Sequence, residues 1–202
     1  MARQRGVVRA GWLLGLLVLA VPGRADEAAA VKMILKLGGQ VVRDDKLPGK
    51  PVVDVDLDTT KVTDAGLREL KGLKSLQLLN LNGTKVTDAG LKELKELKSL
   101  KGLYLDLTEV TDAGLKELKG LKSLQWLDLT GTQVTDEGLK ELKVLKSLQR
   151  LYLKDTKVTD AGLKELKELK SLRSLYLMHT KVTDAGVKEL QAALPRLRIA
   201  PR

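Results

Sequence analysis

The feature that most constrains this chain is a repeat of constant length. The tripeptide Val-Thr-Asp recurs at a step of 24 residues, beginning at residues 62, 86, 110, 134, 158 and 182. A fixed period of roughly 20–30 residues is typical of a solenoid, in which each copy is one structural unit that packs against its neighbours. We therefore expect most of the 202-residue chain to form one elongated domain.

Each copy contains two hydrophobic periods. In the copy that begins at residue 86, Leu91, Leu94 and Leu97 recur at three-residue steps, which favours a short helix. Leu103 and Leu105 then alternate with other residues, which favours a strand. One copy buries too little apolar surface to fold alone, so the copies must stack to close a shared core.

The residues at the start of each predicted helix suit that position. Thr87 can cap the first amide groups of the helix, and Asp88 places a negative charge at its positive end. We infer that Gly90 lacks a Cβ so that the next coil can approach closely. The aspartates at the helix starts, one in each copy, form a column that could also suggest a calcium-binding site. Each of them, however, lacks the clustered oxygen ligands of a calcium loop.

These motifs resemble those of a known family. Residues 76–88 read Leu-x-x-Leu-x-Leu-x-x-Thr-x-Val-Thr-Asp, which resembles a leucine-rich repeat of the ribonuclease-inhibitor-like superfamily. The pattern is similar to the cysteine-containing class, with Thr in place of Cys at the ninth position, and it covers residues 52–199. The ninth positions are Thr60, Thr84, Thr108, Thr132, Thr156 and Thr180.

The resemblance implies a fold and a general role. It implies an α/β architecture, a right-handed solenoid with a parallel sheet on the concave face and short helices on the convex face. It also implies a protein that binds other macromolecules. For the Thr at the ninth position we expect internal hydrogen bonding between coils, because no base accompanies these hydroxyls as it would a nucleophile.

The first 25 residues differ from the rest and have the layout of a secretory signal peptide. Arginines at positions 3, 5 and 9 precede an apolar run, 11–21, that is short for a membrane span, and Gly23 and Ala25 suit a cleavage site. Cleavage near Ala25 removes four arginines and no acid, so the net charge falls from +10 to +6. We expect a protein that is secreted or held in the periplasm or cell envelope; an uncleaved signal anchor is the alternative.

Residues 26–51 should close the N-terminal end of the solenoid. The stretch Asp26–Leu37 suits a capping helix, because it carries spaced apolar residues and stops at a Gly-Gly pair. Residues 40–51 would then lead the chain to a first strand at Val55–Leu57.

The repeats occupy residues 52–190, and residues 191–202 should form a C-terminal cap. Leu194-Pro195 interrupts the repeat pattern, and Leu197 and Ile199 could form a last strand. Atypical end units protect the open edges of a solenoid.

Positions that are constant among the copies belong to the scaffold. Residues that determine which ligand binds can therefore lie only at positions where the copies differ. In each strand the residues beside the inward leucines point to the other face of the sheet. These outward columns hold every aromatic residue that follows residue 25. Because Tyr and Trp recur as binding anchors, we predict a protein-binding site on this face. Its candidate residues are Asn80, Tyr104, Asp106, Trp126, Asp128, Arg150, Tyr152, Lys154, Tyr176 and Met178.

Other interpretations of the same face stay open. Aromatic residues at strand positions also suit cross-strand packing alone. The aromatic rings with Asp106 and Asp128 would suit a carbohydrate as well as a protein. These two Asp could also form a glycosidase pair, although surface carboxylates often come close in this way. We favour a protein partner because the family resemblance does.

The predicted helices carry a basic stripe. Its columns are Arg68, Lys92, Lys116, Lys140, Lys164 and Lys188; Lys71, Lys95, Lys119, Lys143 and Lys167; and Lys74, Lys98, Lys122, Lys146 and Lys170. We interpret the stripe as a solvated face, and association with an anionic envelope polymer or a membrane surface is the alternative function. No aromatic residues interleave with it, which argues against nucleic acid.

Composition excludes several kinds of chemistry. The chain has no Cys, which excludes disulfides and thiolate nucleophiles, and its single His excludes a zinc site built from several histidines. It has no glycine-rich phosphate-binding loop. We therefore expect no enzyme activity, no cofactor and no metal, and a monomer whose His179 lies at the rim of the sheet.

Overall fold

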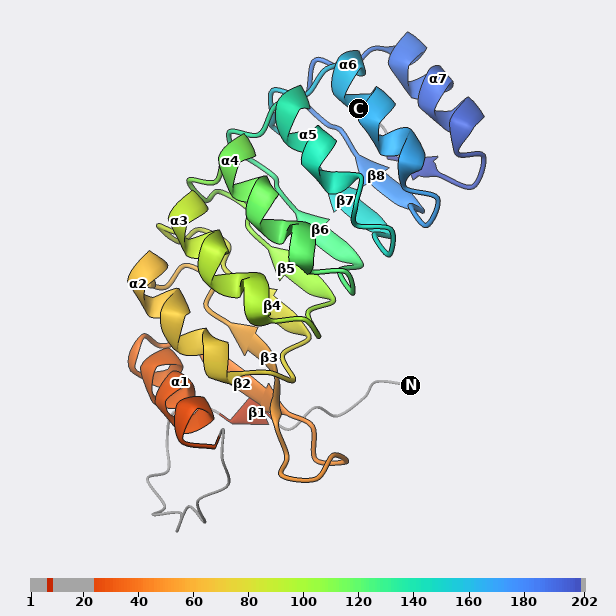
Figure 1. The fold of residues 1–202 in the computed structure, drawn as a ribbon. Helices are drawn as coiled ribbons and strands as arrows, with labels where there is room; N and C mark the ends of the chain where they lie inside the picture. The colour runs from red at the N-terminus through yellow and green to blue at the C-terminus, as the bar shows by residue number, and fades with distance from the viewer. Residues whose placement is uncertain (1–6, 9–23, 201–202) are drawn as a thin grey trace.

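The computed structural model describes residues 7–8 and 24–200, which form two layers that curve together (Figure 1). Within these residues one layer is a nine-stranded sheet in the order β1 to β9. Its strands are β1 (Val7–Val8), β2 (Gln40–Arg43), β3 (Val52–Asp56), β4 (Leu78–Asn80), β5 (Gly102–Tyr104), β6 (Trp126–Asp128), β7 (Arg150–Tyr152), β8 (Ser174–Tyr176) and β9 (Arg198–Ile199).

The second layer consists of helices. The α-helices are α1 (Arg24–Lys36), α2 (Asp64–Leu67), α3 (Asp88–Leu91), α4 (Asp112–Leu115), α5 (Asp136–Leu142), α6 (Asp160–Glu165) and α7 (Asp184–Ala193). Four of the coils continue into 3₁₀ turns: η1 (Arg68–Gly72), η2 (Lys92–Glu96), η3 (Lys116–Gly120) and η4 (Leu166–Glu168).

The spacing of the two layers gives the molecule its curvature. From β3 to β9 each strand pairs in parallel with the next, one strand for each coil. Paired strands lie about 4.7–4.9 Å apart, whereas packed helices need about 8–10 Å. The helices therefore follow the outer arc and the sheet the inner arc, as Figure 1 shows. The predicted α/β solenoid with a concave sheet is confirmed.

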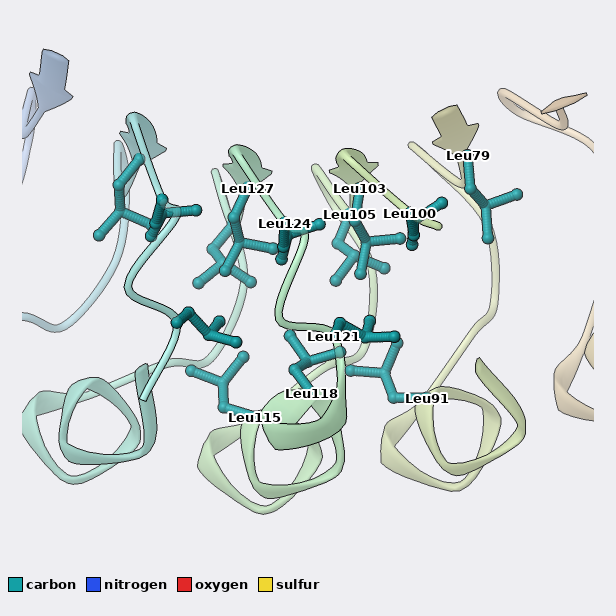
Figure 2. Packing of buried hydrophobic residues seen from close by; sticks show 14 of the residues in the cluster. Leu79, Leu91, Leu100, Leu103, Leu105, Leu115, Leu118, Leu121, Leu124 and Leu127 are labelled. Carbon is teal, nitrogen blue, oxygen red and sulfur yellow. The ribbon is translucent and has the colours of Figure 1, made fainter. Parts of the chain in front are cut away.

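Leucine side chains fill the space between the two layers (Figure 2). Leu91, Leu94 and Leu97 are fully buried although they are only three residues apart. The 3₁₀ turn explains this, because it has three residues per turn and places every third side chain on one face. Leu103 and Leu105 reach the same core from β5 and the residue that follows it.

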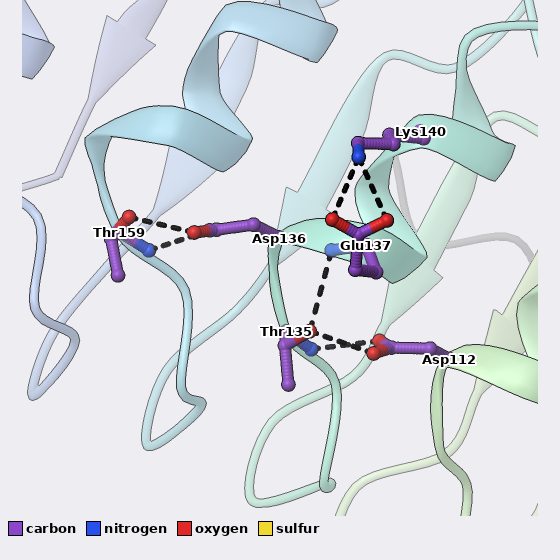
Figure 3. A network of polar contacts seen from close by, with 6 residues as sticks. All are labelled: Asp112, Thr135, Asp136, Glu137, Lys140 and Thr159. Atoms are coloured by element: carbon purple, nitrogen blue, oxygen red, sulfur yellow. Dashed lines mark hydrogen bonds and ion pairs between the residues drawn. The ribbon is translucent and has the colours of Figure 1, made fainter.

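An aspartate at the start of each helix binds the next coil. The backbone amide of Thr135 donates to Oδ1 of Asp112 at 2.8 Å, and its hydroxyl donates to Oδ2 at 2.7 Å (Figure 3). The hydroxyl oxygen of Thr135 also accepts from the amide of Glu137, so the predicted helix cap is confirmed. The pairs of this kind are Asp64–Thr87, Asp88–Thr111, Asp112–Thr135, Asp136–Thr159 and Asp160–Thr183.

From α3 to α7 the glycine in the first turn of the helix makes room for this carboxylate. A Cβ on Gly114 would overlap Oδ1 of Asp88, and Gly90 stands in the same relation to Asp64. The predicted close approach is therefore confirmed, but it is made to the preceding coil. The Asp column thus links coils in addition to starting helices.

The expectation for the Thr at the ninth position was wrong in one respect. The hydroxyl of Thr84 donates to the carbonyl oxygen of Leu81 at 2.6 Å, and that of Thr108 donates to Leu105 at 2.7 Å. Both bonds lie within one coil and close the turn after the strand. Neighbouring coils are joined instead by strand pairing and by the Asp–Thr pairs.

The N-terminal end contains more structure than its sequence suggested. Helix α1 covers this end with Ala30 and Ile34 fully buried, and it begins two residues before the predicted boundary at Asp26. The predicted lead-in contains β2, which pairs antiparallel with β3. The first strand of the repeats begins at Val52, earlier than expected. The predicted signal peptide lies outside the described residues apart from β1, which pairs with β2, and the start of α1.

The described chain ends in a helix and a short strand. Helix α7 ends before Leu194-Pro195, and β9 adds a last parallel strand beside β8. Among the helices in residues 24–200, none is long and apolar enough to cross a membrane.

The Asp–Gly contact predicts how two glycines should differ. Gly114→Ala should lower the free energy of unfolding by about 2 kcal/mol, because the new methyl group displaces the Asp88 carboxylate. Gly120→Ala is the control, since its Cβ would crowd only the flexible end of Lys98 and would lie at an ordinary 3.6 Å from the carbonyl oxygen of Lys95. It should change stability by less than about 0.5 kcal/mol. Urea denaturation measures both variants; equal losses would contradict the role given to Asp88.

Candidate binding face

Strand pairing brings the predicted site residues onto one face of the sheet. Along one outward column Gly102, Trp126 and Arg150 lie opposite one another in register. In the next column Tyr104 pairs with Asp128, and the column continues through Tyr152 and Tyr176. Asn80 on β4 lies opposite Tyr104. Asp106, Lys154 and Met178 occupy the same place after β5, β7 and β8.

The aromatic rings contact their neighbours but stay half-buried. Tyr152 and Tyr176 stack, with ring centroids 4.2 Å apart and planes 5° apart. The guanidinium of Arg150 lies over the ring of Trp126, 5.8 Å from its centroid. Gly102 leaves space for this ring, because a Cβ there would lie 3.2 Å from Cε3 of Trp126. Cross-strand packing is therefore a real part of their role.

Burial and neighbouring groups raise the pKa of two of the tyrosines above their ordinary value. Burial raises the pKa of Tyr104, and the charges of Asp54 and Asp128 raise it further. Burial also raises the pKa of Tyr152, with a further contribution from Tyr176. Both hydroxyls therefore remain protonated near neutral pH and can donate hydrogen bonds.

Two polar atoms on this face have no hydrogen-bond partner among the described residues. They are Oδ1 of Asp106 and Nε1 of Trp126, and both are shielded from solvent. Burial raises the pKa of the Asp106 carboxyl, and Asp128 raises it further while Lys154 partly offsets this. A buried polar atom without a partner costs stability, so a ligand that satisfied these atoms would gain free energy.

A small hollow lies at the C-terminal half of the face. Its volume is about 90 Å³. It is lined by Thr130, Tyr152, Lys154, Tyr176, Leu177, Met178 and Ala200. Because sites for drug-sized ligands occupy about 300–1,000 Å³, this hollow has room for a single side chain.

Leu107 belongs to this region, and the sequence argument did not select it as a site residue. It is 67% exposed and has φ = 54°, a left-handed conformation that is unfavourable for a leucine. Gly83 and Gly131 occupy the same turn in the neighbouring coils. A leucine at a turn position where both neighbours have glycine was the sequence signal that could have identified it. His179 occupies the same turn two coils after Gly131 and lies at the rim of the sheet, as expected. Its Nδ1 lies 2.7 Å from Oδ1 of Asp155.

On the convex face several cations of the basic stripe are paired. Nζ of Lys71 lies 2.5 Å from Glu93, that of Lys119 lies 2.6 Å from Glu141, and that of Lys167 lies 2.7 Å from Glu189. Each of these pairs joins adjacent coils. In the third column Nζ of Lys122 and of Lys146 donates to backbone carbonyl oxygens of the following coil.

No group of three or more potential metal ligands occurs among residues 24–200. Asp106 lies in the turn after β5, and Asp128 at the end of β6 pairs in register with Tyr104, so the two carboxylates do not occupy paired strand positions. Oδ1 of Asp128 accepts a hydrogen bond from the amide of Thr130 at 2.9 Å and so helps to close its own turn.

The raised pKa of Asp106 predicts a pH dependence of stability. The folded protein holds this proton at higher pH than the unfolded chain does, so ionisation lowers stability as pH rises above about 4. Asp106→Asn should therefore be more stable than the parent at pH 7, and the gain should shrink at a pH of about 3.5. Chemical denaturation at the two pH values measures the free energy of unfolding of both proteins. An equal gain in stability at both pH values would contradict the raised pKa of Asp106.

Comparison with known proteins supports the repeat assignment. The family model described as "Leucine Rich repeat" matches residues 72–95, 120–143, 144–167 and 168–190. Three of the matched segments span one 24-residue period each, and the last is one residue shorter. No curated protein matches the chain.

A solved structure shares the fold, and a second is similar over a shorter stretch. An internalin from Listeria monocytogenes is 23% identical over 70% of this chain and 38% of its own, with a TM-score of 0.60. A leucine-rich repeat protein of Leptospira interrogans is 29% identical over 66% of this chain and 39% of its own, with a TM-score of 0.49. The chain thus spans less than half the length of either protein.

Proposed function

The chain is a leucine-rich repeat protein, and from this premise we propose that it is a non-catalytic binding module whose sheet face holds a protein partner. Leucine-rich repeat folds commonly mediate protein–protein interaction, because the curved stack presents an extended concave surface. The observation that carries the proposal is the gathering of Tyr104, Trp126, Tyr152 and Tyr176 on this face. We also propose a place in the ribonuclease-inhibitor-like superfamily, which the leucine spacing and the Val-Thr-Asp helix start support, although Thr stands at the ninth position in place of Cys.

The pattern of variation supports the same face. The leucines, the Thr-Asp pair and the helix glycine recur in the coils because the core and the junctions need them. The outward columns of β4 to β8 change from coil to coil in size, charge and polarity. A surface that served only to stack coils would need no such variation.

The covering of the aromatic ring faces favours a protein partner over a carbohydrate. Sugars bind by stacking on open aromatic faces, but Tyr152 and Tyr176 cover each other and Arg150 covers Trp126. The hollow beside Lys154 and Met178 has the size of one side chain. These features suit the varied side chains of a protein surface.

The basic stripe is better explained by stability than by a polymer ligand. Its ion pairs with glutamates of the next coil and its bonds to carbonyl oxygens hold lysines along the stack. Exposed pairs of this kind contribute less than about 1 kcal/mol each and keep the face solvated.

We also propose export, with cleavage of residues 1–25 near Ala25. The basic, apolar and small-residue regions of that segment support it. Cleavage after Ala25 would remove β1 and the first two residues of α1, and it would leave β2 as the edge strand and Ala30 and Ile34 in place.

Substitution of two rings should weaken partner binding. A Trp126→Ala, Tyr152→Ala double variant should lose about 2 kcal/mol of binding free energy for each ring, because anchors of this type dominate interfaces. Its matched control is Lys116→Gln, Lys143→Gln on the convex face, which should bind like the parent. Capture from a cell-envelope extract at low and moderate salt, followed by titration of the captured protein, measures the losses.

Two results would contradict this account. If the ring variant captures the same partner with unchanged affinity, the sheet face is not the binding site. If capture ignores the ring variant but is lost in moderate salt and in the lysine variant, the basic stripe is the binding surface. Melting curves confirm that both variants are folded, and the N-terminal residue of the exported chain, expected to be Asp26, tests the cleavage.

A further inference from the structure

A second hollow lies away from the sheet face, at the C-terminal cap. Its volume is about 300 Å³, at the lower limit of about 300 Å³ for small-molecule sites. It opens between the turn that precedes β8 and the segment that joins α7 to β9. Its lining is Lys170, Leu172, Arg173, Ala193, Leu194, Pro195 and Arg196.

The hollow lies where the last coil departs from the repeat. Ser174 pairs with Arg198, so the strand keeps the 24-residue register. Before the strand the buried leucines are shifted by one residue, to Leu194 and Leu197. Ala193 is therefore half-buried and Arg196 exposed, and both line the hollow.

The walls of the hollow combine apolar and cationic groups. Ala193 and Pro195 contribute apolar surface, with Leu172 and Leu194 buried beneath it. Lys170, Arg173 and Arg196 contribute three positive charges, and no acidic residue lines the hollow.

One of these cations is held in place. Nη1 of Arg173 donates to the carbonyl oxygens of Lys170 at 2.9 Å and of Leu172 at 3.0 Å. A guanidinium fixed in this way keeps further N–H donors for an anion, and its planar fork suits a carboxylate. Little additional ordering of this side chain is needed when an anion binds.

We propose that this hollow is a binding site for a small amphiphilic carboxylate, with the aliphatic body against Ala193 and Pro195 and the carboxylate at Arg173 and Arg196. The positive charges favour an anionic ligand. The apolar wall favours an anion that also has an aliphatic part, which an inorganic anion lacks. The site is independent of the sheet face, so it stands whether or not the proposed protein partner binds there.

The test uses octanoate as the probe, titrated into the full chain and followed by calorimetry and by NMR shifts. Octanoate should bind, and acetate should bind at least about tenfold more weakly because it lacks the apolar body. Octylamine has the same body with a positive head and should not bind. Failure of octanoate to bind at millimolar concentration, or equal binding of acetate, would overturn the proposal.

Variants locate the site. Ala193→Leu places a larger side chain in the lining of the hollow, and it should lower octanoate affinity about tenfold or more, with a melting curve to confirm that the variant is folded. Arg173→Gln should lower affinity about tenfold, with Arg196→Gln as a second variant in case the loss of the carbonyl contacts unfolds the cap. Arg198→Gln removes the same charge from β9, outside the lining, and should change affinity less than about twofold.

One further result would overturn the proposal. If Ala193→Leu binds octanoate as the parent does, the three cations do not form a ligand site. They would then serve only to complement the negative C-terminal end of α7.

Discussion

The structure depends on the carboxylate that each coil extends to the next. An aspartate such as Asp112 accepts both the amide and the hydroxyl of Thr135, and that same hydroxyl oxygen caps the following helix. The contact is possible only because the helix glycine lacks a Cβ. Three residue types at fixed spacing therefore set the rotation and rise between coils, while the leucines supply the burial that makes stacking favourable.

This fixed geometry gives the sheet face its character. Since every coil repeats the same junction, outward side chains fall into straight columns that the core does not constrain. Tyr152 can then stack on Tyr176, and Arg150 can lie over Trp126, without any change in the scaffold. The unpaired atoms of Asp106 and Trp126 and the strained, exposed Leu107 lie in the same region. Unfavourable features of this kind gather where a surface is shaped for a ligand.

Much of this could be predicted from the sequence, because the period fixes which residues become neighbours. The two layers, the aromatic columns, the helix caps and the last strand all follow from it. The strand β2 could not be predicted in this way, since residues 40–43 have no counterpart in the repeat. The direction of the Thr84 hydroxyl and the C-terminal hollow also depend on three-dimensional detail: a turn geometry in one case, and an altered packing of the last coil in the other.

Side-chain footprinting of the protein with its captured partner tests the central claim most directly. Hydroxyl-radical labelling reports the solvent exposure of Tyr104, Trp126, Tyr152, Tyr176 and Met178, and lysine acetylation in parallel reports the convex stripe. The account predicts that bound partner reduces labelling of these concave residues and leaves acetylation of Lys116 and Lys143 unchanged. Protection of the lysines with unchanged labelling of the aromatic residues would contradict it.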